Sequence, residues 1–297
     1  MTPPPTASAR LALALLALDG VGRVTATRLL DRFPTAEALR ATPREQVLLR
    51  LKGAPKADRT VALLFSDALD AALAVAGAEA DRLAATGVHV LAAGDAAWPA
   101  GLSALGRSER PVVLFAYGNV SALGGPLLAV LGRPPVPAGP FEAAQRIARH
   151  VAAAGAGLAV GIAHGFDLAV QKVAIGAGRA PVAVVGGGLA TLTPSLRPAA
   201  TALVRAGGLL LSPFPMAHGP FPHDDRERAL VQAALSRAVL VAAPAEASPE
   251  SRAAAWAAGA GRPVAVVGDA APGDRAAAWL RADDARTDAD VAAWLAP

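Results

Sequence analysis

Residues 127–133 read LLAVLGR, a short apolar run that ends in glycine and arginine. Similar runs follow further along the chain, and most are separated by a helical stretch of roughly a dozen residues. Apolar runs of this length that alternate with helices are typical of buried strands in a parallel sheet. We therefore predict an α/β fold with an open, mostly parallel sheet, whose strands lie at Leu127–Leu131, Leu158–Val160, Val182–Val185, Leu209–Leu211, Val239–Val241 and Val264–Val267.

Glycine or a small polar residue follows most of these strands. The first four strands are followed by Gly132, Gly161, Gly186–Gly188 and Ser212. Ligands bind parallel sheets at the carboxyl ends of the strands, where glycine lets a phosphate approach the backbone. We therefore expect an anionic, phosphate-bearing ligand at this edge.

Composition limits the class of protein. The chain has 297 residues, no cysteine and a formal net charge of +4. The absence of cysteine excludes disulfides, thiol catalysis and zinc–thiolate sites. Most basic residues are arginines, since the only lysines are Lys52, Lys56 and Lys172. Arginine forms forked contacts with phosphate and suits nucleic acid, but the joint abundance of Ala, Gly, Pro and Arg also fits a GC-rich genome.

No segment is predicted to cross a membrane. The apolar run Leu11–Leu18 is short, is followed by Asp19 and lacks a convincing signal-peptide cleavage site. The stretch Ala180–Leu196 is interrupted by glycines and a proline and is too short for a span. We expect a cytoplasmic protein without a membrane segment.

Residues 1–86 are predicted to form a helical domain, and residues 87–297 an α/β domain with a short helical tail. Helices are expected at Leu11–Leu18, Thr35–Leu39 and Ala57–Thr86. Gly20 and Gly22 form a turn that resembles a helix-hairpin-helix (SAM-like) motif, in which amides meet DNA phosphate. An ordinary helical hairpin explains these glycines equally well. The tail, with helices over 274–280 and 288–295, leaves no room for a winged-helix domain.

Two common nucleotide-binding motifs are absent. Gly186–Gly188 lacks the third glycine of the dinucleotide fingerprint, because Thr191 occupies that place. Lys172 has no glycine-rich loop before it, so there is no Walker A motif. Hydride transfer and ATP hydrolysis lose their main support, and we expect no cofactor.

Eight short motifs follow one another between residues 98 and 268. Each is weak alone, but their order is specific. They are Trp98-Pro99-x-x-Leu102, Pro111–Gly118, Val130-Leu131-Gly132-Arg133, Val160–Asp167, Val184–Leu189, Ser212-Pro213-Phe214-Pro215, Phe221-Pro222-x-x-x-Arg226-Glu227-Arg228 and Gly261–Gly268.

This order and spacing resemble the DNA-processing protein A family (DprA, also called Smf) over about residues 91–295. The resemblance implies an extended Rossmann-like domain that binds single-stranded DNA in a basic pocket. It also implies a homodimer that hands the strand to a RecA-type recombinase during natural transformation. The expected protein is a DNA-binding protein rather than an enzyme.

Several positions depart from the family pattern. Gly132-Arg133 lacks the family's serine, and Val160 stands where the family has serine. Phe166 replaces isoleucine, Gln171 replaces histidine, and Glu227 replaces asparagine. These positions fall at the ligand-binding edge, so they bear on affinity and ligand identity more than on the fold.

Arginines and strand-end glycines make up the predicted DNA-binding site. Arg133 follows a strand end, and Arg226 and Arg228 lie in the first turn of a helix, where the macrodipole opposes cations unless they serve an anion. Each has an alternative explanation. Arg133 can be an ordinary surface arginine, and Arg226 and Arg228 can form salt bridges at the start of their helix. Asp167 is predicted to be a structural helix N-cap. The predicted DNA- and phosphate-binding residues are Gly132, Arg133, Gly161, His164, Gly165, Gly186, Gly187, Gly188, Arg197, Ser212, Arg226 and Arg228.

A second hypothesis is a nucleotide-binding or nucleotide-hydrolysing enzyme on the same sheet. Glu246 and Glu250 follow the fifth strand, where related phosphoribohydrolases carry a Pro-Gly-Gly-x-Gly-Thr-x-x-Glu loop. This chain reads APAEASPE there, so the DNA-binding hypothesis is favoured. No metal site is expected, because the spacing of the candidate ligands matches no common set; these candidates are His218, His223, Asp224 and Asp225.

Overall fold

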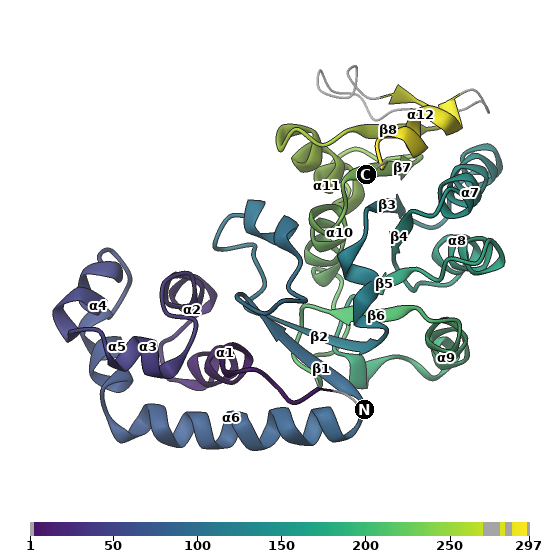
Figure 1. Cartoon of the computed structure of the whole chain (residues 1–297). Coiled ribbons are helices and arrows are strands. Elements are labelled where there is room, and N and C mark those ends of the chain that lie inside the picture. The colour runs from purple at the N-terminus through teal and green to yellow at the C-terminus, as the bar shows by residue number, and fades with distance from the viewer. Residues whose placement is uncertain (1–2, 270–279, 283–286, 296–297) are drawn as a thin grey trace. The chain divides into compact units, whose positions relative to one another are not determined.

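The computed structural model describes residues 3–269, 280–282 and 287–295 (Figure 1). Contacts within the chain divide it into two compact units. The first unit contains residues 1–98 and 105–116, and the second contains residues 99–104 and 117–297. The predicted domain boundary between residues 86 and 87 stays a prediction.

The first unit is mainly helical. The long helix predicted over 57–86 is two helices, because Ser66 interrupts it as an N-cap whose hydroxyl accepts a hydrogen bond from the amide of Ala68. Gly20, with φ of +80°, and Gly22 lie in the exposed turn between the first two helices. The elements of this unit are α1 (Ala7–Ala17), α2 (Arg23–Leu30), α3 (Ala36–Arg40), α4 (Arg44–Arg50), α5 (Ala57–Leu64), α6 (Asp67–Ala85), β1 (Val88–Ala92) and most of β2 (Val113–Gly118).

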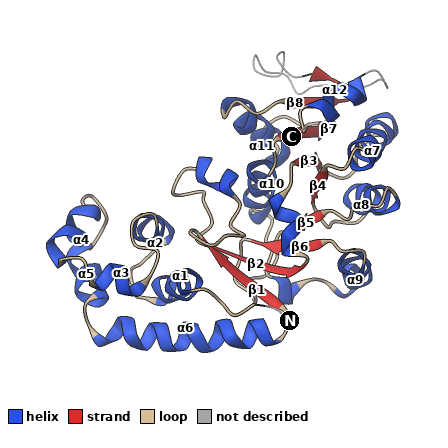
Figure 2. Cartoon of the chain, in the orientation of Figure 1, coloured by secondary structure: helices blue, strands red, loops and turns tan. Residues whose placement is uncertain are grey.

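The second unit alternates strands and helices, as the sequence predicts (Figure 2). Leu280 was expected in a helix and instead begins a short strand, while the rest of that predicted helix lies outside the described residues. The elements are η1 (Ala100–Ala104), η2 (Val120–Gly124), β3 (Leu127–Gly132), α7 (Ala138–Ala153), β4 (Gly157–Val160), α8 (Phe166–Gly176), β5 (Val182–Val184), η3 (Leu189–Thr191), η4 (Pro194–Leu196), α9 (Arg197–Arg205), β6 (Leu209–Ser212), α10 (Asp224–Leu235), β7 (Ala238–Ala242), α11 (Pro249–Gly259), β8 (Val264–Val267), β9 (Leu280–Arg281) and α12 (Thr287–Ala293).

The strands of the second unit form a parallel sheet in the order β6-β5-β4-β3-β7-β8-β9. The chain moves outward from β3 through β4 and β5 to β6, and then returns to the other side of β3 as β7. This reversal is the switch point at which open α/β sheets leave a crevice outside the carboxyl ends of their strands. The loops after β3 and β7 therefore border the place where a ligand is expected.

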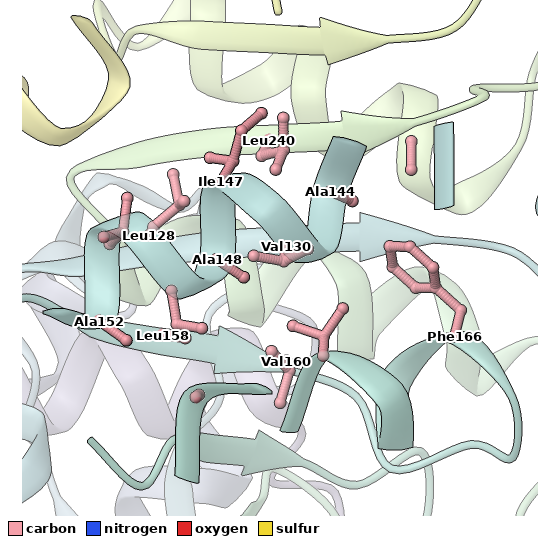
Figure 3. Packing of buried hydrophobic residues seen from close by; sticks show 14 of the residues in the cluster. Leu128, Val130, Ala144, Ile147, Ala148, Ala152, Leu158, Val160, Phe166 and Leu240 are labelled. Atoms are coloured by element: carbon pink, nitrogen blue, oxygen red, sulfur yellow. The ribbon is translucent and has the colours of Figure 1, made fainter. Parts of the chain in front are cut away.

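Alternate residues of each strand pack on opposite faces of this sheet. Leu128, Val130 and Leu240 pack with Ile147 of α7 on the face that α7, α8 and α9 cover (Figures 1 and 3). Ala129, Leu131 and other strand residues point the other way and pack against α10 and α11. The strands are buried on both faces, which explains why they read as continuous apolar runs.

The described residues contain no single helix that combines the length and apolar character needed to cross a membrane. The bent pair α5 and α6, at an angle of 70°, meets those two criteria only when the helices are taken together.

Candidate nucleic-acid interface

A pocket of about 210 Å³ lies at the carboxyl edge of the parallel sheet, within the second unit. Its walls are mostly apolar. They include Ile162, Val185, Leu192, Leu196 and Pro220, and the loop after β3 adds Arg133. Asp167, Asp225, Arg228 and Glu250 complete the lining, and we call these four residues the acidic floor.

Arg228 is at the centre of the acidic floor. Its side chain is only 13% exposed, and its guanidinium donates to Asp225 (Nε–Oδ1, 3.3 Å), Gln232 (Nη1–Oε1, 2.6 Å) and Glu250 (Nη2–Oε1, 3.1 Å). Burial opposes the charged guanidinium, but the surrounding carboxylates outweigh it and raise the pKa of Arg228. A guanidinium that is bonded to these partners is not available to bind a phosphate.

Asp167 is buried beside Arg228. Burial is the main cause that raises the pKa of Asp167 from 3.8 to about 6, against the opposing effects of Arg228 and a hydrogen bond from Ala163. The amide of Ala163 donates to Oδ2 of Asp167 at 3.0 Å, so the carboxyl group holds the turn after β4. The prediction of Asp167 as N-cap is wrong, because the helix begins two residues earlier than that prediction requires, at Phe166, and its N-cap is Gly165.

Several strand-end glycines are required by packing within the protein. A Cβ on Gly132 would lie 2.5 Å from the ring of Phe166, and a Cβ on Gly161 would collide with the carboxyl group of Asp167. A Cβ on Gly188 would collide with backbone carbonyls at residues 215 and 216, and its amide already donates to the carbonyl of His218 at 2.7 Å. Gly186 and Gly187 line the pocket.

Ser212 does not belong to a DNA-facing surface. Its side chain is fully buried, and its hydroxyl donates to the carbonyl of Gly187 at 2.7 Å and accepts from the amide of Phe214 at 3.0 Å. The prediction that Ser212 binds DNA is therefore wrong, because this hydroxyl links two loops of the protein instead.

Two exposed arginines and an exposed histidine follow three neighbouring strands at this edge of the sheet. Arg133 follows β3, His164 follows β4 and Arg197 follows the loop after β5. His164 Nε2 lies 3.1 Å from the hydroxyl of Ser195, and Arg197 Nε donates weakly to the carbonyl of Leu192 at 3.4 Å. Arg133 has no hydrogen bond or ion pair among the described residues. We call Arg133, His164 and Arg197 the rim.

The loop between β6 and α10 carries a stack of rings. His218 stacks on Phe214 at 4.8 Å and meets Phe221 edge-on at 5.2 Å, and Phe221 stacks on His223 at 5.5 Å. Phe221 is 50% exposed, so about half of its surface is open to solvent. Arg226, in the first turn of α10, is also exposed.

His218 and Asp224 form a hydrogen-bonded pair. His218 Nε2 lies 2.9 Å from Asp224 Oδ2, which also accepts from the amide of Phe221. Over the described residues, no three histidine, aspartate or glutamate side chains are placed to hold a metal ion.

Sequence reasoning missed how closely Arg228 is surrounded by acids. Glu250 is separated from Arg228 by 21 intervening residues, and the packing of α11 beside α10 brings them together. Glu246, the other candidate carboxylate of that loop, is exposed and does not line the pocket. The polar Ser248-Pro249-Glu250-Ser251 segment is the available signal, since it marks a capped helix start directly after a buried strand.

Comparison with known proteins agrees with this architecture. The sequence profile of the family described as "DNA recombination-mediator protein A" matches residues 89–291. Protein Smf of Escherichia coli (strain K12) is 30% identical over 154 residues, which are 52% of this chain and 41% of Protein Smf. The match therefore spans less than half the length of that relative.

Two solved structures share the fold. DNA processing protein A (DprA) from Streptococcus pneumoniae aligns with a TM-score of 0.57 and 19% identity, over 87% of this chain and 90% of that one. DNA processing protein A from Helicobacter pylori, described for its single-stranded DNA binding mode, aligns with a TM-score of 0.52 and 22% identity, over 62% and 81%. With the profile match covering more than half of its length, this chain belongs to the DNA recombination-mediator protein A family, known also as DprA or Smf.

Proposed function

We propose that this chain binds single-stranded DNA along the rim of the parallel sheet and presents it to a RecA-type recombinase during natural transformation. The observation that carries the proposal is the exposed guanidinium of Arg133 at the end of β3, which has no partner among the described residues. Family membership supports the same function. So does the Helicobacter pylori relative, which is described as binding single-stranded DNA.

The arrangement of the rim suits a backbone-binding role. The strands β5, β4 and β3 are neighbours in the sheet, and the contact of His164 with Ser195 places the segment before Arg197 beside the loop after β4. Guanidinium groups bind phosphates of any sequence, which gives affinity that falls with salt. Phe221, half exposed, offers a surface on which a base can stack.

A titration of a labelled single-stranded oligonucleotide tests this function. We expect Arg133→Ala to weaken binding tenfold or more, on the order of 1.4 kcal/mol. Arg205→Ala is the matched control, because Arg205 is an exposed arginine in the last turn of α9, at the opposite end from Arg197. If wild type, Arg133→Ala and Arg205→Ala bind the oligonucleotide with equal affinity, the rim is not the DNA-binding site.

Three finer parts of the proposal need separate measurements. Sedimentation at micromolar concentration tests the homodimer. Strand exchange with a RecA-type recombinase on coated single strands tests the loading step. Expression of residues 1–86 and 87–297 as separate chains tests the proposed domain boundary and shows whether the Gly20–Gly22 turn binds DNA by itself.

The enzyme hypothesis has less support in the geometry. Glu246 is exposed and lies outside the pocket lining, and Glu250 is paired with Arg228. Incubation with nucleoside monophosphates, followed by an assay for free base, distinguishes the two. Product that disappears in Glu250→Gln would favour the enzyme.

A further inference from the structure

The stack of rings between β6 and α10 ends on an exposed histidine. We call Phe214, His218, Phe221 and His223 the ring stack. The ring centroids of Phe221 and His223 are 5.5 Å apart, and the two planes are within 3° of parallel. The side chain of His223 is 78% exposed although one face is stacked, so the rest of the imidazole is open to solvent. Imidazole is one of the rings on which unpaired bases stack, so a base that extends the ring stack would contact His223.

Asp224 holds the ring stack in place. Its side chain is only 4% exposed, and its Oδ2 lies 2.9 Å from His218 Nε2 and accepts from the amide of Phe221 at 2.9 Å. Its Oδ1 lies 3.4 Å from His223 Nε2. An exposed side chain that becomes ordered on binding costs about 0.5–1.5 kcal/mol. Because Asp224 and Phe221 already restrain the imidazole of His223, this cost is smaller here.

The ring stack lies against the segment after β5, which also contacts the rim. The carbonyl of His218 accepts from the amide of Gly188 at 2.7 Å and from the hydroxyl of Thr191 at 2.8 Å. The same segment continues to Ser195, whose hydroxyl lies 3.1 Å from Nε2 of His164 in the rim. The ring stack and the rim therefore belong to one edge of the sheet, within the second unit.

The charges beside the ring stack favour a base over a phosphate. Residues 224–228 read DDRER, which places three carboxyl groups against two guanidinium groups directly after His223. Carboxylates repel a phosphate, whereas a neutral base offers a flat face to an aromatic ring. The exposed arginines of the rim, Arg133 and Arg197, suit the phosphates instead.

We propose that one base of a bound single strand stacks on the open surface of His223, while the rim holds phosphates of the same strand. This inference rests on the proposed function and adds to it the residue at which the ring stack meets a base. Every base has a flat face, so the contact raises affinity without selecting a sequence.

Fluorescence anisotropy of the full chain with two labelled strands tests the inference. One strand is an ordinary single-stranded oligonucleotide, and the other is an abasic strand of the same length that keeps every phosphate. We expect His223→Ala to bind the first strand about fivefold more weakly than wild type and the abasic strand equally well. The salt dependence of affinity should stay that of wild type, because stacking releases no counterions.

Two further variants separate the ring from its position. His223→Phe keeps a flat ring and should retain the affinity of wild type for both strands. His150→Ala is the matched control, because His150 is an exposed histidine in the last turn of α7 and should leave both affinities unchanged. A strand that carries the fluorescent base 2-aminopurine gives a second readout, since its emission falls when the base stacks. At saturating protein this fall should be smaller in His223→Ala than in wild type.

Three results overturn the inference. His223→Ala could bind both strands as His150→Ala does, it could weaken both strands equally, which would mean a phosphate contact, or His223→Phe could bind as weakly as His223→Ala. If Arg133→Ala weakens binding and His223→Ala does not, the proposed function stands and this inference alone fails. If wild type binds neither strand, the proposed function fails and this inference fails with it.

Discussion

The rim and the acidic floor present the same chemical group in two different environments. Arg133 on the rim is exposed and has no partner among the described residues, whereas Arg228 in the floor is 13% exposed and bonded to two carboxylates and an amide. Both arginines line the pocket at one edge of the sheet, Arg133 on the loop after β3 and Arg228 in the first turns of α10. Their comparison shows that a position at a strand or helix end does not determine whether a guanidinium can bind a phosphate. The number of carboxylates that the fold places beside it determines this.

The largest expected effect comes from Arg228→Ala. Removing a buried cation leaves Asp225 and Glu250 without their counter-charge, and breaking a buried pair in this way costs about 3–5 kcal/mol. Urea unfolding measures the loss. Arg226→Ala, at the exposed neighbouring position, should change stability by less than about 1 kcal/mol. An Arg228→Ala protein of normal stability that binds oligonucleotide poorly would place Arg228 with the rim and break the comparison.

The next effect depends on pH and comes from Asp167. Its pKa is raised to about 6 by burial, so the folded protein holds this proton more tightly than the unfolded chain does. The stabilisation is therefore complete below pH 3.8 and is lost as pH rises through 6, with a size of up to about 3 kcal/mol. Asp167→Asn keeps an acceptor for the amide of Ala163 but does not titrate.

Urea unfolding of wild type and Asp167→Asn between about pH 4 and pH 7 measures the contribution of Asp167 to stability. The stability of wild type relative to the variant should fall as pH rises from about 4 to 6 and then level off, because the remaining carboxylates contribute equally to both proteins. A constant difference would mean that Asp167 does not change its protonation state over this range, and that burial does not raise its pKa as we infer.

The sequence predicts the fold well and the floor poorly, for a physical reason. Each strand is a local apolar run, and the alternation of Leu128 and Val130 with Ala129 and Leu131 between two cores needs only short-range information. The ion pair of Arg228 with Glu250 joins α10 to α11, two helices that are separated in the sequence by β7. The first turn of α10 can be predicted as basic, but whether its charges meet phosphate or carboxylate is a tertiary property.

The strand-end glycines also separate residues required by packing from residues that bind a ligand. A Cβ on Gly188 would collide with two backbone carbonyls that cannot move like a flexible side chain, so Gly188→Ala should cost about 1–3 kcal/mol of stability. Gly139→Ala, in α7, meets nothing within 4 Å and should be neutral or slightly stabilising. Thermal unfolding compares them. If Gly188→Ala has normal stability but lower oligonucleotide affinity, Gly188 contributes to DNA binding and not to packing.

The smallest expected effect separates Arg197 from Arg133 within the rim. Arg197 donates weakly to the carbonyl of Leu192, so only part of its guanidinium is available to a phosphate, and Arg197→Ala should weaken oligonucleotide binding about threefold, or roughly 0.6 kcal/mol. The dependence of log affinity on log salt should flatten by about 0.7, the value for one phosphate contact on a single strand. In the Arg133→Ala, Arg197→Ala double variant the two losses should add, because the residues share no contact partner among the described residues. If the salt slope stays that of wild type in Arg197→Ala but flattens in Arg205→Ala, the strand runs along the other end of α9, and the rim is not where DNA binds.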